Sequence, residues 1–194
     1  MIIIAININM IKNDSGIIRA DRGNNTEYRK ILAAVKDGEL VRLRNGLYAK
    51  PDALVGSIVD IDAIVPEGIM CLYSAWSYYN LTTQVPDAFY VAVSRSRKIK
   101  LPAFPDIKPI FQCTDLLEIG KEKIEEQGIK FLITDIERSV CDAVKYRNKI
   151  GIDVMAEIID NYLQRSDRSL SRLAEYAKQL RVYSTLHQIL QIKL

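Results

Sequence analysis

The sequence predicts an α+β fold built in two parts. In the first part an amphipathic run over residues 26–37 stops at Gly38, and two short alternating segments joined by Asn45 and Gly46 follow it, which predicts a helix and then a β-hairpin. In the second part, strand patterns dominate before residue 134 and helical patterns dominate after it. Strands followed by helices are typical of mixed α+β domains.

The helix and hairpin match the last third of a winged helix-turn-helix. Within the hairpin, Leu40, Leu43 and Leu47 take apolar positions, while Arg42 and Arg44 alternate onto one face beside the turn. Cations at the tip of a β-ribbon suit a phosphate backbone. This ribbon is therefore expected to be the wing of a DNA-binding unit.

The elements before that helix are less clearly patterned. Residues 1–11 are β-branched and mixed with Asn, so their periodicity fits either a first helix or an edge strand. Residues 17–22 are expected to form a short helix with an apolar face, ahead of a turn at residues 23–25. Two short helices joined by a Gly-containing turn fit helix-turn-helix geometry.

The helix before the hairpin is the best-marked element. Asn25 or Thr26 can cap it, and Ile31, Leu32 and Val35 form a stripe that is expected to be buried. Turning that stripe into the core leaves an outer face that carries Thr26, Arg29, Lys30, Ala33 and Lys36. A cationic face that begins with Asn and Thr is typical of a recognition helix in a DNA major groove.

The second part begins after a connecting helix predicted over residues 51–65. That helix ends at Pro66, which places the domain boundary between residues 1–66 and 67–194. Strand patterns cover residues 69–72, 88–94, 110–113 and 129–133, with a proline-containing loop over residues 101–109. Helical patterns cover residues 74–80 with Ser74 as the cap, 135–146, 153–163 and 170–190.

Charge and cysteine content agree with a small DNA-binding protein. The net charge is only +3, but residues 1–50 hold nine Lys or Arg against five Asp or Glu, so the positive excess lies in the winged-helix candidate. The three cysteines lie far apart in apolar contexts and are expected to be core thiols. The apolar start is too short to span a bilayer and lacks a leader-peptide pattern, so we expect a soluble cytoplasmic protein.

Catalytic motifs are scarce. The single histidine, His187, lies near the C-terminus in an apolar helix, which removes most histidine-based triads and metal clusters. The sequence contains neither a phosphate-binding glycine loop nor a Gly-x-Ser-x-Gly elbow. We therefore expect no enzyme, no cofactor and no metal.

Several motifs, in order, resemble the AbiEi-type antitoxins of type IV toxin–antitoxin systems. They are the wing at residues 38–49, the segment from residues 73–76 through 80–82, the strand at residues 89–93, and residues 134–142. The match runs from about residue 16 to residue 163. Residues 1–10 depart from the helical start of that family, and the tail after Arg168 carries no matching motif.

The resemblance implies a winged helix joined to a C-terminal antitoxin domain in a bacterial autorepressor. Such a protein binds its own promoter DNA at inverted repeats, and it opposes a nucleotidyltransferase-like toxin without a tight complex or a membrane partner. Two alternatives remain open. One is a protein-interaction or ligand-sensing module whose wing is structural, and the other is an enzyme that acts through residues 135–142.

The expected DNA contacts come from the helix, the turn before it and the hairpin. They are Asn24, Asn25, Thr26, Arg29, Lys30, Lys36, Arg42, Arg44 and Lys50. The Asn and Thr residues can instead serve as turn and cap, and the cations can be solvated surface charges. The basic run at residues 95–100 is either a second nucleic-acid surface or, as we expect, a solvated loop.

Polar residues of the last motif are the candidates for antitoxin function. They are Asp135, Arg138 and Asp142. Arg138 and Asp142 stand four apart and can also pair with each other on a helix, while Asp135 can cap that helix. The aromatic residues between 73 and 79 are expected in the core rather than against nucleic-acid bases.

Overall fold

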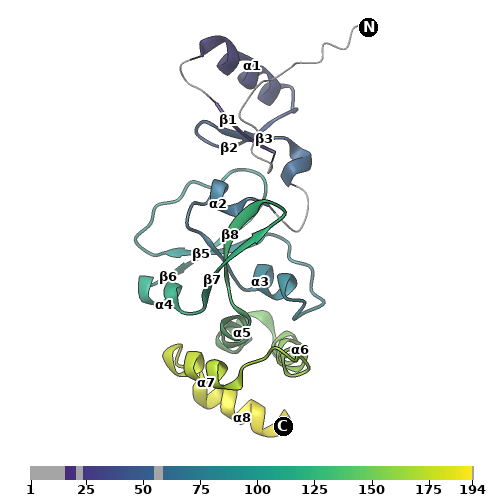
Figure 1. Cartoon of the computed structure of the whole chain (residues 1–194), viewed down its shortest axis with the longest axis vertical. Helices are drawn as coiled ribbons and strands as arrows, with labels where there is room; N and C mark the ends of the chain where they lie inside the picture. Colours follow the sequence, from purple (N-terminus) through teal and green to yellow (C-terminus); the bar gives the residue numbers. More distant parts are fainter. Residues whose placement is uncertain (1–15, 21–23, 55–58, 194) are drawn as a thin grey trace.

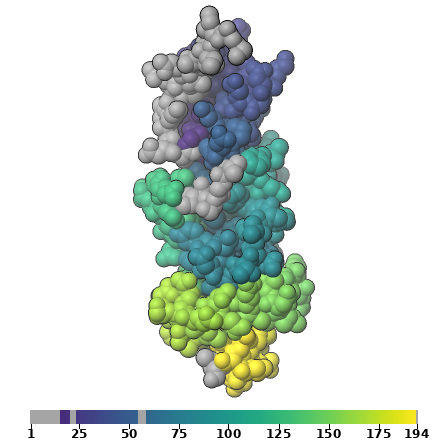
Figure 2. Space-filling view, turned by 90° about the vertical axis from the view of Figure 1, so that its right-hand side faces the viewer, coloured from purple at the N-terminus to yellow at the C-terminus, as the bar shows by residue number. Residues whose placement is uncertain are grey.

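The computed structural model describes residues 16–20, 24–54 and 59–193. These residues form a mixed α+β fold with eight α-helices, one 3-10 helix and two β-sheets. Along the long axis, the first helix and a small sheet lie at one end, the larger sheet lies in the middle, and the C-terminal helices lie at the other end (Figure 1). Figure 2 shows the same order in a view turned by 90°. The element expected at residues 1–11 lies outside the described residues.

The first sheet is antiparallel and has the strand order β1-β3-β2. Its strands are β1 (Ile17–Arg19), β2 (Val41–Arg44) and β3 (Leu47–Ala49), and helix α1 (Asn25–Lys36) connects β1 to β2. The predicted helix and hairpin are thus present. Gly46 in the hairpin turn has a φ of 78°, a left-handed conformation that favours glycine.

The helix predicted over residues 17–22 is wrong, because strand β1 occupies its first half. Ile17 pairs with Ala49 and Ile18 pairs with Tyr48 in antiparallel register. β-Branched residues suit extended backbone when a partner strand is available. The partner here is β3, which lies far along the chain, so local periodicity cannot detect the pairing.

Both faces of the small sheet are buried. On one face, Ile18 and Tyr48 pack with Ile31 of α1. The other face contributes Ile17, Leu43, Leu47 and Ala49 to an apolar cluster that also contains Met70, Val91, Phe131 and Ile133. Apolar packing therefore continues from the small sheet into the larger one, across the boundary expected at Pro66.

The connection between the two sheets is not the single helix expected over residues 51–65. It contains a 3-10 helix, η1 (Pro51–Leu54), and a short α-helix, α2 (Ile61–Ile64). The Asp60 side chain accepts a hydrogen bond from the backbone N–H of Ala63 at 2.8 Å. This capping bond begins a new helix at residue 61, which the apolar periodicity of the segment does not indicate.

The second sheet has the strand order β6-β5-β4-β8-β7. Its strands are β4 (Ile69–Met70), β5 (Phe89–Ser94), β6 (Ile107–Gln112), β7 (Lys121–Glu126) and β8 (Ile129–Thr134). β4 runs parallel to β8 and β5 runs parallel to β6, whereas the β4–β5 and β7–β8 pairs are antiparallel. All except β7 overlap the predicted strand patterns.

The two edge strands explain the differences from prediction. β6 includes Pro109, which belongs to the loop predicted at residues 101–109, and an edge strand tolerates proline because one side of its backbone needs no partner strand. β7 has the sequence Lys-Glu-Lys-Ile-Glu-Glu and is mostly exposed, so it lacks the apolar alternation that marks a strand. Its pairing with β8 holds it in the sheet.

Helices make up the rest of the second part. They are α3 (Tyr73–Tyr78), α4 (Thr114–Glu118), α5 (Ile136–Ile150), α6 (Ile152–Leu163), α7 (Leu170–Gln179) and α8 (Tyr183–Lys193). The predicted inward residues of α5, which are Val140, Ala143 and Val144, are buried. The single helix predicted over residues 170–190 is two helices, because the chain turns between them at Arg181, which has a φ of 60°.

Helix α3 joins the sheet to the C-terminal helices. Its Trp76 is fully buried and donates a hydrogen bond from Nε1 to the carbonyl oxygen of Ser139 at 2.9 Å, so the predicted core role holds for this residue. Ser74 is not the helix cap: it lies inside α3, where its Oγ accepts a hydrogen bond from the backbone N–H of Tyr90 at 2.8 Å. Leu72 precedes the helix with a φ of 49°, an uncommon conformation for a branched residue.

The cysteines do not all behave as core thiols. Cys71 and Cys141 are buried, but Cys113 is exposed at the start of α4. The apolar neighbours of Cys113 in sequence therefore do not predict its exposure. No helix in the described part of the chain combines the length and apolar character needed to cross a membrane.

Candidate nucleic-acid interface

Helix α1 presents a cationic outer face. Thr26, Arg29, Lys30, Ala33 and Lys36 are all exposed, as predicted. The inner stripe is narrower than predicted: Ile31 is buried and Val35 is partly buried, but Leu32 is 42% exposed. A three-stranded sheet is narrow and covers only a thin strip of the helix, so Leu32 falls outside the contact.

Of the three polar residues at the start of α1, one caps the helix and two are exposed. Asn24, rather than Asn25 or Thr26, caps the helix, with its Oδ1 accepting a hydrogen bond from the backbone N–H of Glu27 at 3.3 Å. Its Nδ2 also donates to the Glu27 carboxylate at 3.3 Å. Asn25 and Thr26 are exposed in the first turn, and they are the polar side chains there that remain directed to solvent.

The two arginines of the hairpin, Arg42 and Arg44, have different surroundings. Arg42 is exposed and donates from Nη2 to Oδ1 of Asn45 at 3.1 Å, across the turn. Between Arg42 and Arg44 the register against β3 shifts, which marks a β-bulge. Arg44 is partly buried and lines a groove, and Lys50 is exposed after β3.

That groove lies between the hairpin turn and the second part of the chain. Its volume is about 620 Å³, and its walls come from β1, the hairpin turn, residues 64–66 and residues 97–100. Five cations line it: Arg19, Arg44, Arg97, Lys98 and Lys100. We call this feature the basic groove. The Arg97 guanidinium donates a hydrogen bond to the carbonyl oxygen of Pro66, which holds the loop after β5 against the end of α2.

The basic groove concentrates positive side chains. Among the residues that the structure describes, no Asp or Glu lines the groove and none of its five cations forms an ion pair. Cations gathered without carboxylates focus a field that attracts polyanions. A phosphate backbone would neutralise this charge and release bound counterions.

Four of the five cations in the basic groove are not among the DNA contacts expected from the sequence. Arg19 is absent from the expected contacts, and residues 95–100 are expected to be a solvated loop. Residues 95–100 are a loop in which Arg95, Lys98 and Lys100 are exposed, as expected, and residues 97–100 also line the basic groove together with Arg44. The basic run was the available signal, but its distance along the chain from the hairpin hides the contact.

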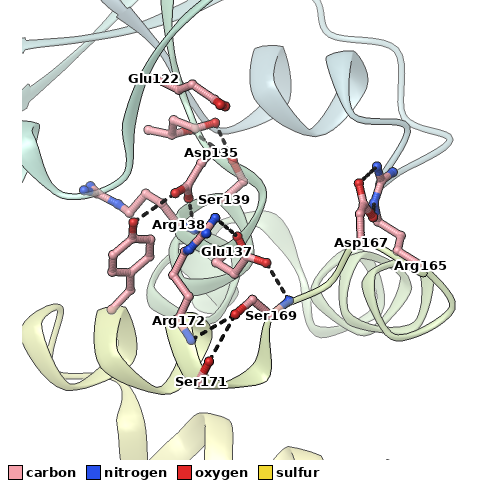
Figure 3. A network of polar contacts seen from close by, with 12 residues as sticks. Glu122, Asp135, Glu137, Arg138, Ser139, Arg165, Asp167, Ser169, Ser171 and Arg172 are labelled. Atoms are coloured by element: carbon pink, nitrogen blue, oxygen red, sulfur yellow. Dashed lines mark hydrogen bonds and ion pairs between the residues drawn. The ribbon is translucent and has the colours of Figure 1, made fainter.

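Asp135 caps helix α5 as expected. Its Oδ1 accepts a hydrogen bond from the backbone N–H of Arg138 at 2.8 Å, and its Oδ2 accepts one from the hydroxyl of Tyr176 at 3.0 Å (Figure 3). Burial raises the pKa of Asp135, although both hydrogen bonds act against that shift. Burial and the nearby Asp135 charge raise the pKa of Tyr176 to about 12.

Arg138 and Asp142 form a fully buried ion pair. Their side chains are 1% and 0% exposed, and Arg138 Nε lies 3.1 Å from each carboxylate oxygen of Asp142. The Arg138 guanidinium also donates to the carbonyl oxygens of Leu116 and Ile119 and to the Gln112 side chain. Burial raises the pKa of Asp142 despite the neighbouring positive charge. The pair therefore ties the α4 region to α5 inside the core.

A second buried carboxylate joins three C-terminal helices. Glu137 accepts hydrogen bonds from the Tyr162 hydroxyl at 3.2 Å and the Ser169 backbone N–H at 2.9 Å. The exposed Arg172 side chain lies 3.5 Å from the same carboxylate (Figure 3). Sequence spacing does not single out this residue, because its partners come from α6 and α7.

The described residues contain no cluster of three or more His, Cys, Asp or Glu side chains that could hold a metal ion. His187 stacks on Tyr183 in α8, with ring centroids 5.7 Å apart. No protein-family model matches the chain, and no curated protein matches it significantly.

Proposed function

We propose that this protein is a cytoplasmic DNA-binding transcriptional repressor that also serves as the antitoxin of an AbiE-like type IV toxin–antitoxin system. The observation that supports DNA binding best is the basic groove, where five cations and no carboxylate are found among the described lining residues. The exposed cationic face of α1 adds a second basic surface. Basic surfaces on a helix and a β-ribbon suit the groove and the backbone of a DNA duplex.

In this proposal α1 and the hairpin act as a winged-helix unit. Arg29, Lys30 and Lys36 enter or flank the major groove, and Asn25 and Thr26 are the side chains best able to reach base edges. Asn24 positions the helix as its cap. Arg42, Arg44 and Lys50 contact adjacent phosphates.

The second part of the chain contributes to the same interface. Arg97, Lys98 and Lys100 face the hairpin turn across the basic groove. A phosphate backbone that leaves the wing can therefore continue along these three side chains. The DNA contacts extend beyond residues 1–66 in this arrangement, which revises the expectation that residues 95–100 are only a solvated loop.

The antitoxin role rests on the resemblance of motifs described above. We propose that the promoter carries inverted repeats and that a nucleotidyltransferase-like toxin is opposed without a tight complex. Asp135, Arg138 and Asp142 support this role by holding the second part in shape, because Arg138 and Asp142 are too buried to touch another molecule. The same burial argues against an enzyme acting through residues 135–142.

The DNA-binding proposal is tested by salt dependence. Binding to DNA from upstream of the gene is measured by fluorescence anisotropy over a range of salt concentrations. Replacing Arg44, Lys98 and Lys100 with Gln should lower the slope of log affinity against log salt by about 2 to 3, since each phosphate contact contributes about 0.9. Replacing Arg29, Lys30 and Lys36 with Gln should lower this slope by a comparable amount.

A control variant that removes two positive charges elsewhere, against three in the groove variant, separates the effect of the interface from that of overall charge. Lys123 on β7 and Lys178 on α7 are outside the basic groove. The double variant Lys123→Gln with Lys178→Gln therefore lowers the net charge and leaves the basic groove unchanged. This variant should keep the wild-type slope. Equal slopes for the control and the groove variant would exclude the basic groove from the interface.

The antitoxin proposal needs a separate measurement. The reading frames next to this gene are first examined for a nucleotidyltransferase-like protein, which the proposal requires, and that protein is then expressed in cells with and without the present chain. Growth should stop without the chain and recover with it, and the groove variant should still rescue growth while failing to repress the promoter. Failure of the wild-type chain to restore growth would refute the antitoxin role and leave the DNA-binding role intact.

A further inference from the structure

A second, larger cleft lies beside α3 and the start of β5. Its volume is about 890 Å³, which is the size of a typical small-molecule site. Met70, Phe89 and Pro105 contribute apolar lining. Two further apolar lining residues reach solvent, since Val85 is 89% exposed and Phe104 is 40% exposed.

The charge of this cleft is opposite to that of the basic groove. Asp87, Asp106 and Glu126 line it, and its described lining residues include no Lys or Arg. Asp87 is paired with the Lys108 ammonium at 2.5 Å, and hydrogen bonds from Lys108 and Tyr90 lower its pKa, so its negative charge is already balanced. Among the described residues, Asp106 and Glu126 form no ion pair and supply the negative charge of the cleft. An apolar cavity with an excess of carboxylates attracts a positively charged ligand.

Aromatic rings add a second feature that favours cations. Tyr78, Phe89 and Phe104 all line the cleft. The face of an aromatic ring attracts an organic cation, and this attraction strengthens as water is excluded. The Tyr78 hydroxyl donates a hydrogen bond to Glu126 at 3.1 Å, which places one ring beside one carboxylate.

One wall of the cleft is held in place by hydrogen bonds. The chain leading to Val85 is anchored to α6, because the Glu157 carboxylate accepts bonds from the Thr82 hydroxyl at 2.8 Å and the Thr83 backbone N–H at 2.7 Å. Asn161 donates to the carbonyl oxygen of Leu81 at 3.0 Å. A wall already in position lowers the ordering cost of binding a ligand.

We propose that this cleft binds a small organic cation with an apolar, aromatic or aliphatic body. The cationic centre lies near Asp106 and Glu126, and the apolar body packs against Met70, Phe89 and Phe104. The site is separate from the basic groove, which repels cations. It gives the second part of the chain a ligand-sensing role that does not depend on DNA binding.

The test uses two probes of the same shape and opposite charge, tetraphenylphosphonium and tetraphenylborate. Each is titrated into the full-length protein without DNA, and the amide NMR signals of Ser77 and Ala88 report binding in the cleft. The phosphonium should shift these signals in a saturable manner. The borate should leave them unchanged, even where it shifts signals near the basic groove.

Matched variants identify the carboxylates. Glu126→Gln keeps an acceptor for Tyr78, and it should weaken phosphonium binding about tenfold through the loss of one nearby charge. Asp106→Asn should have a similar effect. Glu122→Gln is the control, because Glu122 lies on the same strand and accepts a comparable bond from Tyr79 at 3.3 Å but does not line the cleft. The Glu122→Gln variant should bind the phosphonium with the same affinity as the wild type.

Thermal melts of each variant verify that the fold is intact. Equal affinity of the two probes at Ser77 and Ala88 would show that the cleft is merely apolar and would overturn the proposal. Unshifted signals with the phosphonium would overturn it as well. So would equal phosphonium affinity in Glu126→Gln, Asp106→Asn and the wild type.

Discussion

The buried guanidinium of Arg138 connects several segments of the second part of the chain. Its charge is removed from water and meets one carboxylate, two backbone carbonyls and one side-chain amide. A buried ion pair adds little net stability compared with a well-packed apolar pair, but removing one partner leaves a charge that nothing compensates. The polar residues of the most recognisable motif are therefore sensitive to substitution for a structural reason.

We predict that Asp142→Asn destabilises the protein by about 3 to 5 kcal/mol, because it leaves the Arg138 charge buried and unpaired. Urea unfolding followed by circular dichroism measures the change. The combined variant Arg138→Met with Asp142→Leu should lose much less than the sum of the two single changes. An unaltered unfolding midpoint in Asp142→Asn would show that the pair is not maintained in solution.

Asp135 should make stability depend on pH. Because burial raises its pKa, the native state keeps its proton at pH values where the unfolded chain has lost it. The free energy of unfolding contributed by this group is therefore largest below the ordinary aspartate pKa and decreases as pH rises through the raised value. Asp135→Asn retains a capping oxygen and should remove this dependence, whereas Asp135→Ala should remove it as well and be less stable than Asp135→Asn by about 1 kcal/mol at every pH, because the cap is lost. Urea midpoints between pH 3 and pH 8 test both expectations.

At the scale of elements, the turns carry much of the local specificity. The hairpin turn needs a left-handed residue at Gly46, and a second left-handed glycine, Gly120, precedes β7. Their surroundings differ. An added Cβ at Gly46 meets nothing within 4 Å, whereas one at Gly120 would lie 2.5 Å from Cβ of Arg138 and 2.8 Å from Oδ1 of Asp135.

We predict that Gly46→Ala costs about 1 kcal/mol, which reflects backbone strain alone. Gly120→Ala should lower the free energy of unfolding by at least about 3 kcal/mol, because the new methyl group also displaces the first turn of α5. The two unfolding free energies, measured side by side in urea, give the comparison. Equal losses would mean that the contact between Gly120 and α5 relaxes at little cost.

At the scale of the whole molecule, the two sheets share one apolar cluster. Leu43 and Leu47 from the hairpin belong to the same cluster as Phe131 and Ile133 from β8. A domain that relies on its neighbour to cover a sheet face does not present an independent core. We therefore expect the described parts to unfold in one cooperative transition.

Trp76 provides the test, because it is the only tryptophan and lies in the second part of the chain. Leu47→Ala removes core contacts in the first part and should cost about 2 to 5 kcal/mol. The unfolding midpoint reported by Trp76 fluorescence should fall with it. Leu32→Ala, on the exposed side of α1, should leave that midpoint unchanged. If Leu47→Ala leaves the midpoint reported by Trp76 unchanged, the two parts are separate domains divided near Pro66.

Elements with complete local patterns could be predicted from the sequence. The amphipathic helix α1, the hairpin after it, helix α5 and strands β5 and β8 all follow from periodicity and turn residues, which depend on neighbours along the chain. The outward cations of α1 follow from the same geometry. The candidate DNA-binding residues on α1 and the hairpin can thus be predicted from the sequence alone.

Tertiary structure decided the remainder. Ile17–Arg19 is a strand because β3 pairs with it, and charged β7 is a strand because β8 pairs with it. The basic groove exists because the loop after β5 meets the hairpin turn, and the Arg138–Asp142 pair is buried because α4 and α5 enclose it. These features depend on contacts between segments distant along the chain, and local propensity carries no information about such contacts.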